Sequence, residues 1–155
     1  KLARLVQAPR HHLVDPALAA RLLGVDRGAL LHGDASSMLP NFTPKDGALL
    51  GQLFESLVTL SVRVCAQASS ATVSHFREHD GRREIDLIVE REDRRVIAIE
   101  VKLSATVDDA DVRHLLWLQG RLKDDLLDAL IVTTGSHAYR RADGIGVIPA
   151  ALLTA

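Results

Sequence analysis

The sequence predicts an α/β domain in which helices flank a mixed sheet. The first observation is that apolar and polar residues alternate in two short segments, 84–90 and 96–102, as expected for half-buried strands. The residues between them, 91–95, are all charged and have the length of a hairpin loop. The second observation is that helical spacing precedes this hairpin and also follows it, before a further strand. A helix that joins a hairpin to a later strand implies a mixed sheet with helices on both sides.

Residues 1–46 are expected to form a short helical segment and a linker that pack on the core. Asp15 and Pro16 suit the start of a helix, because Asp caps a helix and Pro fits its first turn. The stretch 33–47 is rich in Ser, Asp, Asn and Pro, which predicts a loop. We therefore place the main domain at residues 47–155.

The main domain is expected to contain a helix, three strands, a second helix and two further strands. The helices are predicted from apolar residues at helical spacing, and the strands from short β-branched runs. The expected bounds are 48 to about 66 for the first helix, 73–77 for a strand before a turn at Asp80 and Gly81, 84–90 and 96–102 for the hairpin, 108 to about 122 for the second helix, and 129–133 and 145–148 for the last strands.

Composition indicates one soluble domain. The 155 residues are 47% hydrophobic, which is enough for a single core. The single cysteine, Cys65, cannot form an internal disulfide, which suits the cytoplasm. No apolar stretch is expected to reach the roughly 18 to 20 residues of a membrane span. A net charge of −1 argues against a surface that grips nucleic acid along its whole length.

Arginines nevertheless cluster around the hairpin. The cluster has two interpretations, a track for DNA or a charged sheet edge that resists aggregation. Its members are Arg77, Arg82, Arg83, Arg91, Arg94 and Arg95.

Two carboxylates lie inside the apolar hairpin strands, where charges are costly unless they are paired or hold a cation. Alternation places Asp86 on the opposite face from Ile85 and Leu87. With a loop at 91–95, Asp86 lies directly across from Glu100. Facing carboxylates repel unless a positive charge lies between them, so a divalent metal is expected there.

Mg²⁺ suits this pair, because it takes one or two carboxylates and completes its shell with water and phosphate oxygens. In the same register Glu84 lies across from Lys102, and Lys102 follows Glu100 on the same face. Lys102 could orient the attacking water or neutralise a scissile phosphate. The alternative is a structural ion cluster in which Lys102 neutralises one carboxylate.

The segments 83–88 (REIDLI) and 99–102 (IEVK) resemble the PD-(D/E)xK nuclease core of restriction endonucleases and archaeal Holliday-junction resolvases. The resemblance implies a restriction-endonuclease-like α-β-β-β-α-β core. It departs at Ile85, where such motifs have Pro. These families often carry one more acid on the helix before the sheet, and Glu55 within 51–58 fits that position.

Further short motifs extend the resemblance over nearly the whole chain. They are, in order, Pro9, Asp15, Leu18, Leu23-Gly24, 51–58, Phe76-Arg77, 84–86, 100–104 and Ile148-Pro149. In this order and spacing the chain resembles the C-terminal domain of unknown function attached to prokaryotic AAA-type ATPases. That resemblance implies an upstream ATPase domain as partner, and Lys1 in place of Met also suggests a piece of a longer protein. This chain lacks G-x-x-x-x-G-K-[ST], so no ATP site is expected in it.

These observations lead to two hypotheses. The first is a Mg²⁺- or Mn²⁺-dependent phosphodiesterase acting on DNA, in which Asp86 and Glu100 hold the metal, Lys102 assists the water, and Glu55 helps through a second metal or a water. The second is a catalytically inactive module of the same fold, which binds nucleic acid or a protein partner for the upstream ATPase.

Other chemistries are not supported. Residues 75–79 match H-x-x-E-H, but that zinc motif requires a helix and this segment reads as a strand and a turn. Ser104 and Ser136 have no recognisable His and Asp partners, so a serine hydrolase is not indicated. Trp117 is expected in the core and not as a base-stacking platform, because aromatic residues make up only 3% of the chain.

Overall fold

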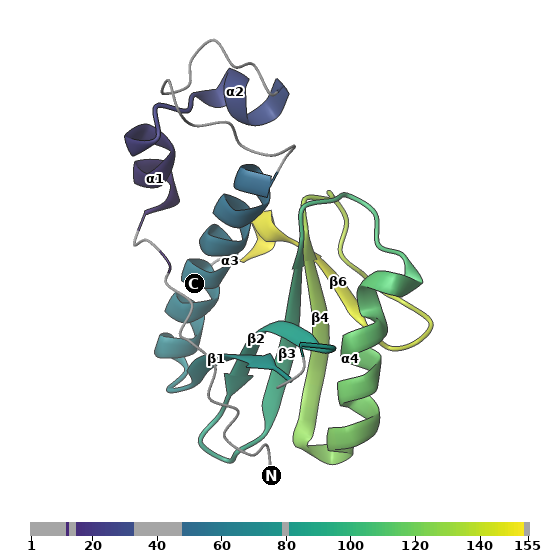
Figure 1. Ribbon diagram of the computed structural model, residues 1–155. Helices are drawn as coiled ribbons and strands as arrows, with labels where there is room; N and C mark the ends of the chain where they lie inside the picture. Colours follow the sequence, from purple (N-terminus) through teal and green to yellow (C-terminus); the bar gives the residue numbers. More distant parts are fainter. Residues whose placement is uncertain (1–11, 13–14, 33–47, 79–80, 154–155) are drawn as a thin grey trace.

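The computed structural model describes residues 12, 15–32, 48–78 and 81–153 (Figure 1). One mixed sheet runs in the order β1-β2-β3-β4-β6-β5, with α3 on one face and α4 on the other. The helices are α1 (Pro16–Leu22), α2 (Arg27–His32), α3 (Ala48–Ala68) and α4 (Asp109–Leu122), with short 3-10 turns at Lys123–Asp125 and Ala150–Leu152. The strands are β1 (Thr72–Arg77), β2 (Glu84–Glu90), β3 (Val96–Lys102), β4 (Leu126–Thr133), β5 (Tyr139–Arg140) and β6 (Gly146–Pro149).

The predicted α/β class and the order of the core elements are confirmed. The strand β5 and the helix α2 were not predicted, because two and six residues give little periodicity to detect. Asp15 caps α1 as expected, since its Oδ1 accepts a hydrogen bond from Ala17 N at 2.8 Å. The predicted loop at 33–47 and residue 80 of the predicted turn lie outside the described residues.

The predicted hairpin register is confirmed over four residue pairs, whereas the predicted pairings of Asp86 with Glu100 and of Glu84 with Lys102 are not part of the ladder. The loop spans 91–95, and Glu90 pairs with Val96 in an antiparallel ladder that ends at Leu87 and Ile99. From Val96 onward β3 pairs with β4 in parallel. The sheet is therefore mixed, as a hairpin followed by a helical crossover requires.

Helix α3 covers one face of the sheet with a row of buried residues. Val58, Val62 and Ala66 pack against Leu87 and Val132, together with other residues of β2 and β3. The expectation that no apolar stretch reaches the length of a membrane span was wrong. Among the described residues α3 alone is long and apolar enough by length and composition, a test that core helices of soluble proteins also pass.

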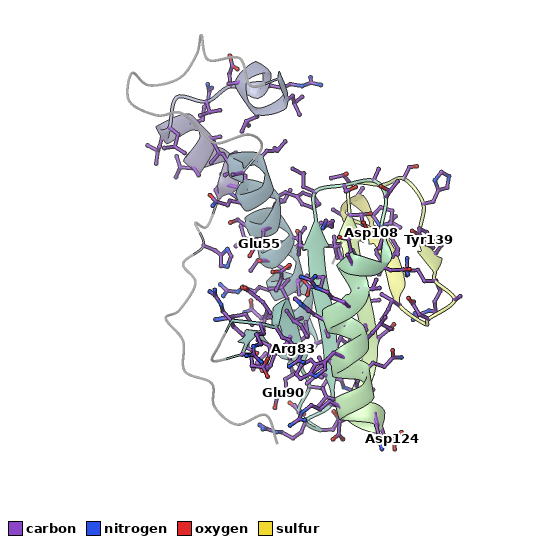
Figure 2. The ribbon with its side chains drawn as sticks, turned by 45° about the vertical axis from the view of Figure 1, so that its right-hand side comes forward. Glu55, Arg83, Glu90, Asp108, Asp124 and Tyr139 are labelled. Atoms are coloured by element: carbon purple, nitrogen blue, oxygen red, sulfur yellow. The ribbon has the colours of Figure 1, made fainter. Side chains whose placement is uncertain are left out.

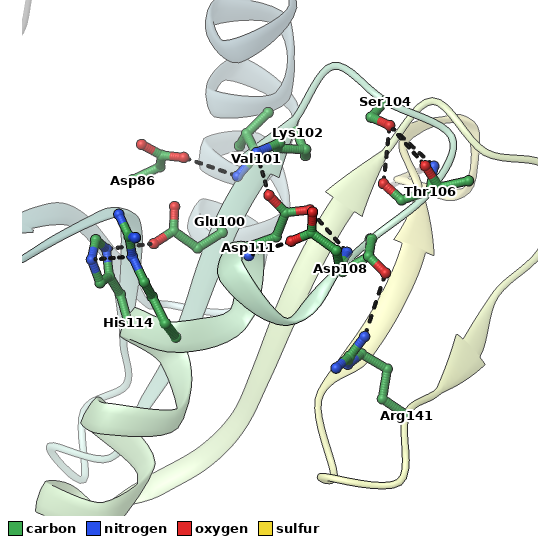
Figure 3. Close-up of polar contacts among 12 residues, drawn as sticks. Asp86, Glu100, Val101, Lys102, Ser104, Thr106, Asp108, Asp111, His114 and Arg141 are labelled. Carbon is green, nitrogen blue, oxygen red and sulfur yellow. Dashed lines mark hydrogen bonds and ion pairs between the residues drawn. The ribbon is translucent and has the colours of Figure 1, made fainter.

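Helix α4 covers the opposite face. The Asp108 side chain accepts from Asp111 N while the Asp111 side chain accepts from Asp108 N, and this capping box fixes the start of the helix. Fully buried residues of α4 then contact β2 and β4 in a second apolar cluster that includes Val112, Leu115, Leu118, Ile85 and Ile131. The α4 capping box lies next to the end of β3, where the candidate site is located (Figure 3).

Candidate functional site

Asp86 lies in a β-bulge. Ser74 of β1 pairs with Ile88 and Phe76 pairs with Ile85, so the single residue His75 faces both Asp86 and Leu87. A bulge interrupts the alternation of side chains along a strand. The prediction that Ile85 and Leu87 share a face was therefore wrong, because Ile85 packs in the cluster under α4 and Leu87 in the cluster under α3.

The Asp86 carboxylate binds the neighbouring strand directly. Its Oδ2 accepts a hydrogen bond from the backbone N–H of Val101 at 2.9 Å (Figure 3). The β2–β3 ladder stops one position short of Asp86 and Glu100. The N–H of Val101 therefore has no backbone partner in β2, and the Asp86 carboxylate accepts its hydrogen bond. Asp86 is thereby held at the backbone group that directly follows Glu100.

Glu100 points toward α4 and approaches His114. Their closest atoms, Glu100 Oε1 and His114 Nδ1, are 3.9 Å apart, and both side chains are about one-fifth exposed. His114 Nδ1 donates to the carbonyl oxygen of Glu84 at 2.9 Å, and its Nε2 accepts from Arg113 Nε at 3.1 Å. This pattern belongs to a neutral imidazole with its proton on Nδ1.

Burial, together with the nearby charges of Arg113 and Arg83, holds the pKa of His114 below its ordinary value. The Asp86 carboxylate acts in the opposite direction. The Asp86 carboxylate therefore interacts electrostatically with the same imidazole that Glu100 approaches. Sequence reasoning missed His114; the signal was its place one turn after Asp111 on the helix that follows β3.

Lys102 pairs with Asp111 of α4. Its Nζ donates to Asp111 Oδ1, and the lysine side chain is half exposed whereas the aspartate side chain is nearly buried. The prediction that Lys102 faces Glu84 was wrong. The β2–β3 ladder ends before that pair; on the other edge of β2, Glu84 pairs with Arg77 of β1 and lies 3.6 Å from its Nε.

The Asp111 carboxyl is held ionised. Burial raises its pKa, but hydrogen bonds from Lys102 and from the Asp108 backbone outweigh this effect and keep the pKa below its ordinary value. Asp111 therefore links the cap of α4 to the one lysine of the candidate site. Sequence reasoning did not select Asp111, although the pattern D-x-x-D at 108–111 is typical of a helix start.

Glu55 lies on α3, half-buried (Figure 2). It is one helical turn before Thr59, so the two residues share a face of the helix. Thr59 lines a cavity of about 150 Å³ between α3 and the bulged strands, and Asp86 lines the same cavity. Glu55 itself is not among the described residues that line this cavity.

The donor set fits magnesium better than zinc. Within the described residues no group of three or more His, Cys, Asp or Glu side chains is placed to hold a metal ion. Asp86 and Glu100 would be the protein ligands, and Mg²⁺ is commonly held by one or two carboxylates plus water. Zinc takes at least three protein ligands. Residues 75–77 form a strand, so the helical context that a zinc-binding H-x-x-E-H needs is absent there.

The arginine cluster at the hairpin consists largely of ion pairs. Arg83 contacts Glu78 at 2.9 Å, and Arg95 contacts Asp93 at 2.8 Å. Similar pairs join Arg77 to Glu84, Arg91 to Asp93 and Arg94 to Glu90. These pairs favour the charged sheet edge over a DNA track. The guanidinium of Arg83 also stacks 4.6 Å from the Trp117 ring, which packs against the core as predicted.

A comparison with protein families gives one match. The model of the family described as "Domain of unknown function (DUF4143)" matches residues 50–153, which hold the whole sheet together with α4 and nearly all of α3. No curated protein matches the chain.

Proposed function

We propose that this chain, which belongs to the DUF4143 family of domains of unknown function, is a divalent-metal-dependent phosphodiesterase that acts on DNA. The observation that carries the proposal is the hydrogen bond from Val101 N to the Asp86 carboxylate. It anchors one acid at the backbone group next to Glu100, at the end of the β2–β3 ladder. Asp86 of β2, held against β3 by this hydrogen bond, and Glu100 of β3 carry like charges, and a divalent cation between them would relieve their repulsion.

The surrounding residues have separate tasks in this proposal. A bound Mg²⁺ or Mn²⁺ would neutralise a phosphate oxygen and lower the pKa of a water. Asp86 and Glu100 supply the negative charge that selects a hard cation. Lys102 has a half-exposed side chain and can exchange Asp111 for a substrate phosphate, which places its charge where negative charge grows. Glu55 would orient water from α3.

The resemblance to the C-terminal domains of AAA-type ATPases extends the proposal to the parent protein. In it, an ATPase domain precedes this chain and delivers DNA to the site in the cytoplasm. A restriction-endonuclease-like core is the fold that this proposal implies, and the mixed sheet between two helical layers agrees with it.

The test is a cleavage assay on supercoiled, branched and single-stranded DNA with Mg²⁺ or Mn²⁺. Glu100→Gln should lower the cleavage rate at least about 100-fold, because the metal loses one of its two carboxylates. Glu92→Gln is the matched control, since Glu92 is an exposed glutamate of the hairpin loop on the same β-hairpin. Equal rates for both variants and the unmodified chain would refute the assignment of Glu100.

A second function is favoured by the pairing of Lys102 with Asp111. If this pair is structural, the chain is an inactive module that docks nucleic acid or a protein for the ATPase. The module predicts no cleavage at any metal concentration and DNA binding that survives Lys102→Ala. The enzyme predicts that Asp111→Asn, which releases Lys102, retains cleavage while Lys102→Ala abolishes it.

A further inference from the structure

The cavity beside Asp86 is lined by hydrogen-bond donors from three parts of the chain. The donors are Thr59 and Arg63 of α3, Ser74 and His75 of β1, and His12 of the N-terminal segment. His12 is held over α3 by a contact of 3.2 Å between its Nδ1 and Ser56 Oγ. The volume of about 150 Å³ is several times what one water needs, so the cavity has room for a small polyatomic group.

Thr59 indicates that the cavity receives a polar ligand. Thr59 is 1% exposed, and its Oγ1 has no hydrogen-bond partner within the described part of the chain. A buried hydroxyl without a partner costs free energy, so such groups normally have one. Since Thr59 lines the cavity, a partner in the cavity would satisfy this hydroxyl.

Arg63 gives the cavity its positive charge. It lies one turn after Thr59 on the same face of α3 and is exposed, which places it toward solvent while Thr59 lies at the buried end. Guanidinium and hydroxyl groups together are typical of sites that hold phosphate oxygens. Asp86 is the one acid among the described residues of the lining, and its carboxylate would repel an anion unless a cation lies between them.

We infer that this cavity binds a phosphate group of the nucleic-acid strand, with Arg63 and Thr59 as its donors and a divalent cation joining it to Asp86. The inference rests on the proposed function, in which Asp86 binds a divalent cation. The phosphate bound here is a neighbour of the cleaved one, since it lies on the α3 side of Asp86 while Glu100 points toward α4.

The test is calorimetric binding of inorganic phosphate to the whole chain with and without Mg²⁺. In the presence of Mg²⁺, Arg63→Gln should weaken binding at least tenfold and Thr59→Val several-fold. Arg121→Gln is the matched control, because Arg121 is an exposed arginine in the last turn of α4 on the far face of the sheet, and it should change nothing. Asp86→Asn removes the repelling charge, so this variant should bind phosphate without Mg²⁺.

Two further arms identify the source of the phosphate and separate this inference from the proposed function. A short oligonucleotide with a 5′-phosphate should bind more tightly than its 5′-hydroxyl counterpart, and the difference should vanish in Arg63→Gln. Equal binding of the two oligonucleotides would overturn the assignment to a nucleic-acid strand. Absence of phosphate binding in both the unmodified chain and Asp86→Asn would overturn the cavity site. Arg63-dependent binding in a chain that cleaves no DNA would refute the proposed enzyme and leave the cavity site standing.

Discussion

Asp86 has a structural role in addition to the ligand-binding role proposed for it. Its carboxylate accepts the N–H of Val101, a group that the β2–β3 ladder does not satisfy on that side. Asp86→Ala removes the acceptor and should lower the free energy of unfolding by about 1–3 kcal/mol, the cost of an unsatisfied partly buried donor. Asp86→Asn keeps an oxygen at the same place and should cost less than about 1 kcal/mol.

Denaturant unfolding of the two Asp86 variants measures this difference. It also makes Asp86→Asn the better variant for cleavage assays, because the fold is preserved while the negative charge is lost. Equal destabilisation by Asn and Ala would mean that the charge of Asp86, and not its hydrogen bond, supports the sheet.

His114 makes the stability of the protein depend on pH. Its pKa in the folded chain lies below its ordinary value, so at acidic pH the unfolded chain takes up a proton more readily than the folded chain. The contribution of neutral His114 to the stability of the fold is therefore fully present above about pH 6.5, the ordinary pKa of histidine. This contribution is lost as the pH decreases through the lowered pKa of His114. His114→Gln should unfold with a weaker dependence on pH between 7.5 and 5 than the unmodified chain.

The measurement is the melting temperature across that pH range. The control is His137→Gln, which changes an exposed histidine in the loop after β4 and should leave the slope as it is. A slope that stays the same in His114→Gln would show that another group titrates.

At the level of elements, the hairpin shows what the sequence could and could not predict. The alternation of residues 84–90 and 96–102 sufficed to predict both strands, and the loop at 91–95 gave the register of the four pairs from Glu90–Val96 to Leu87–Ile99. The bulge at Asp86 and Leu87 could not be predicted. A bulge inserts one residue opposite His75 without any change in composition, so only the partner strand reveals it.

The sequence predicted the positions of site residues best on β3, which has no bulge in its pairing with β2. Glu100 and Lys102 lie two apart on a regular strand, and alternation correctly placed them on the same face, which the structure shows to be the face toward α4. The contacts of these two residues with Asp111 and His114 depend on how α4 returns along the sheet. The sequence marks Asp108 and Asp111 as a helix start, but which strand end this helix meets is set by packing between distant segments.

The hairpin loop contains one strained residue. Arg94 has a φ of 68°, in the left-handed region that costs a non-glycine residue about 1 kcal/mol or more. Arg94→Gly should therefore raise the free energy of unfolding by up to about 1 kcal/mol, since the lost Arg94–Glu90 ion pair is exposed and contributes little. Glu92→Gly, at a loop position without positive φ, should lower it. Thermal unfolding of both variants decides the sign, and a loss of stability in Arg94→Gly would contradict this account.

For the whole molecule, the sheet is the structural centre and both layers depend on β4. Ile131 of β4 is fully buried in the cluster under α4, and the next residue, Val132, is fully buried in the cluster under α3. The two layers are therefore coupled through one strand, and the candidate site lies where β3, the neighbour of β4, ends beside α4 (Figure 3). A rigid support of this kind holds Asp86 and Glu100 in place at the end of the strands.

The division of the chain at residue 46 is a prediction about the whole molecule, and a shortened chain tests it. In the described part, α1 and α2 contact α3, and Ala20, Val25 and Ala29 are buried there. A chain of residues 47–155 should keep the sheet and unfold in one cooperative step, because both apolar clusters under α3 and α4 lie within it.

The shortened chain should also expose apolar surface on α3, which already carries the exposed Leu57 and Val64. Light scattering should then show more self-association for the shortened chain than for the full chain. A shortened chain that fails to fold would mean that residues 1–46 belong to the core, because the α3 layer alone could not bury enough apolar surface without them.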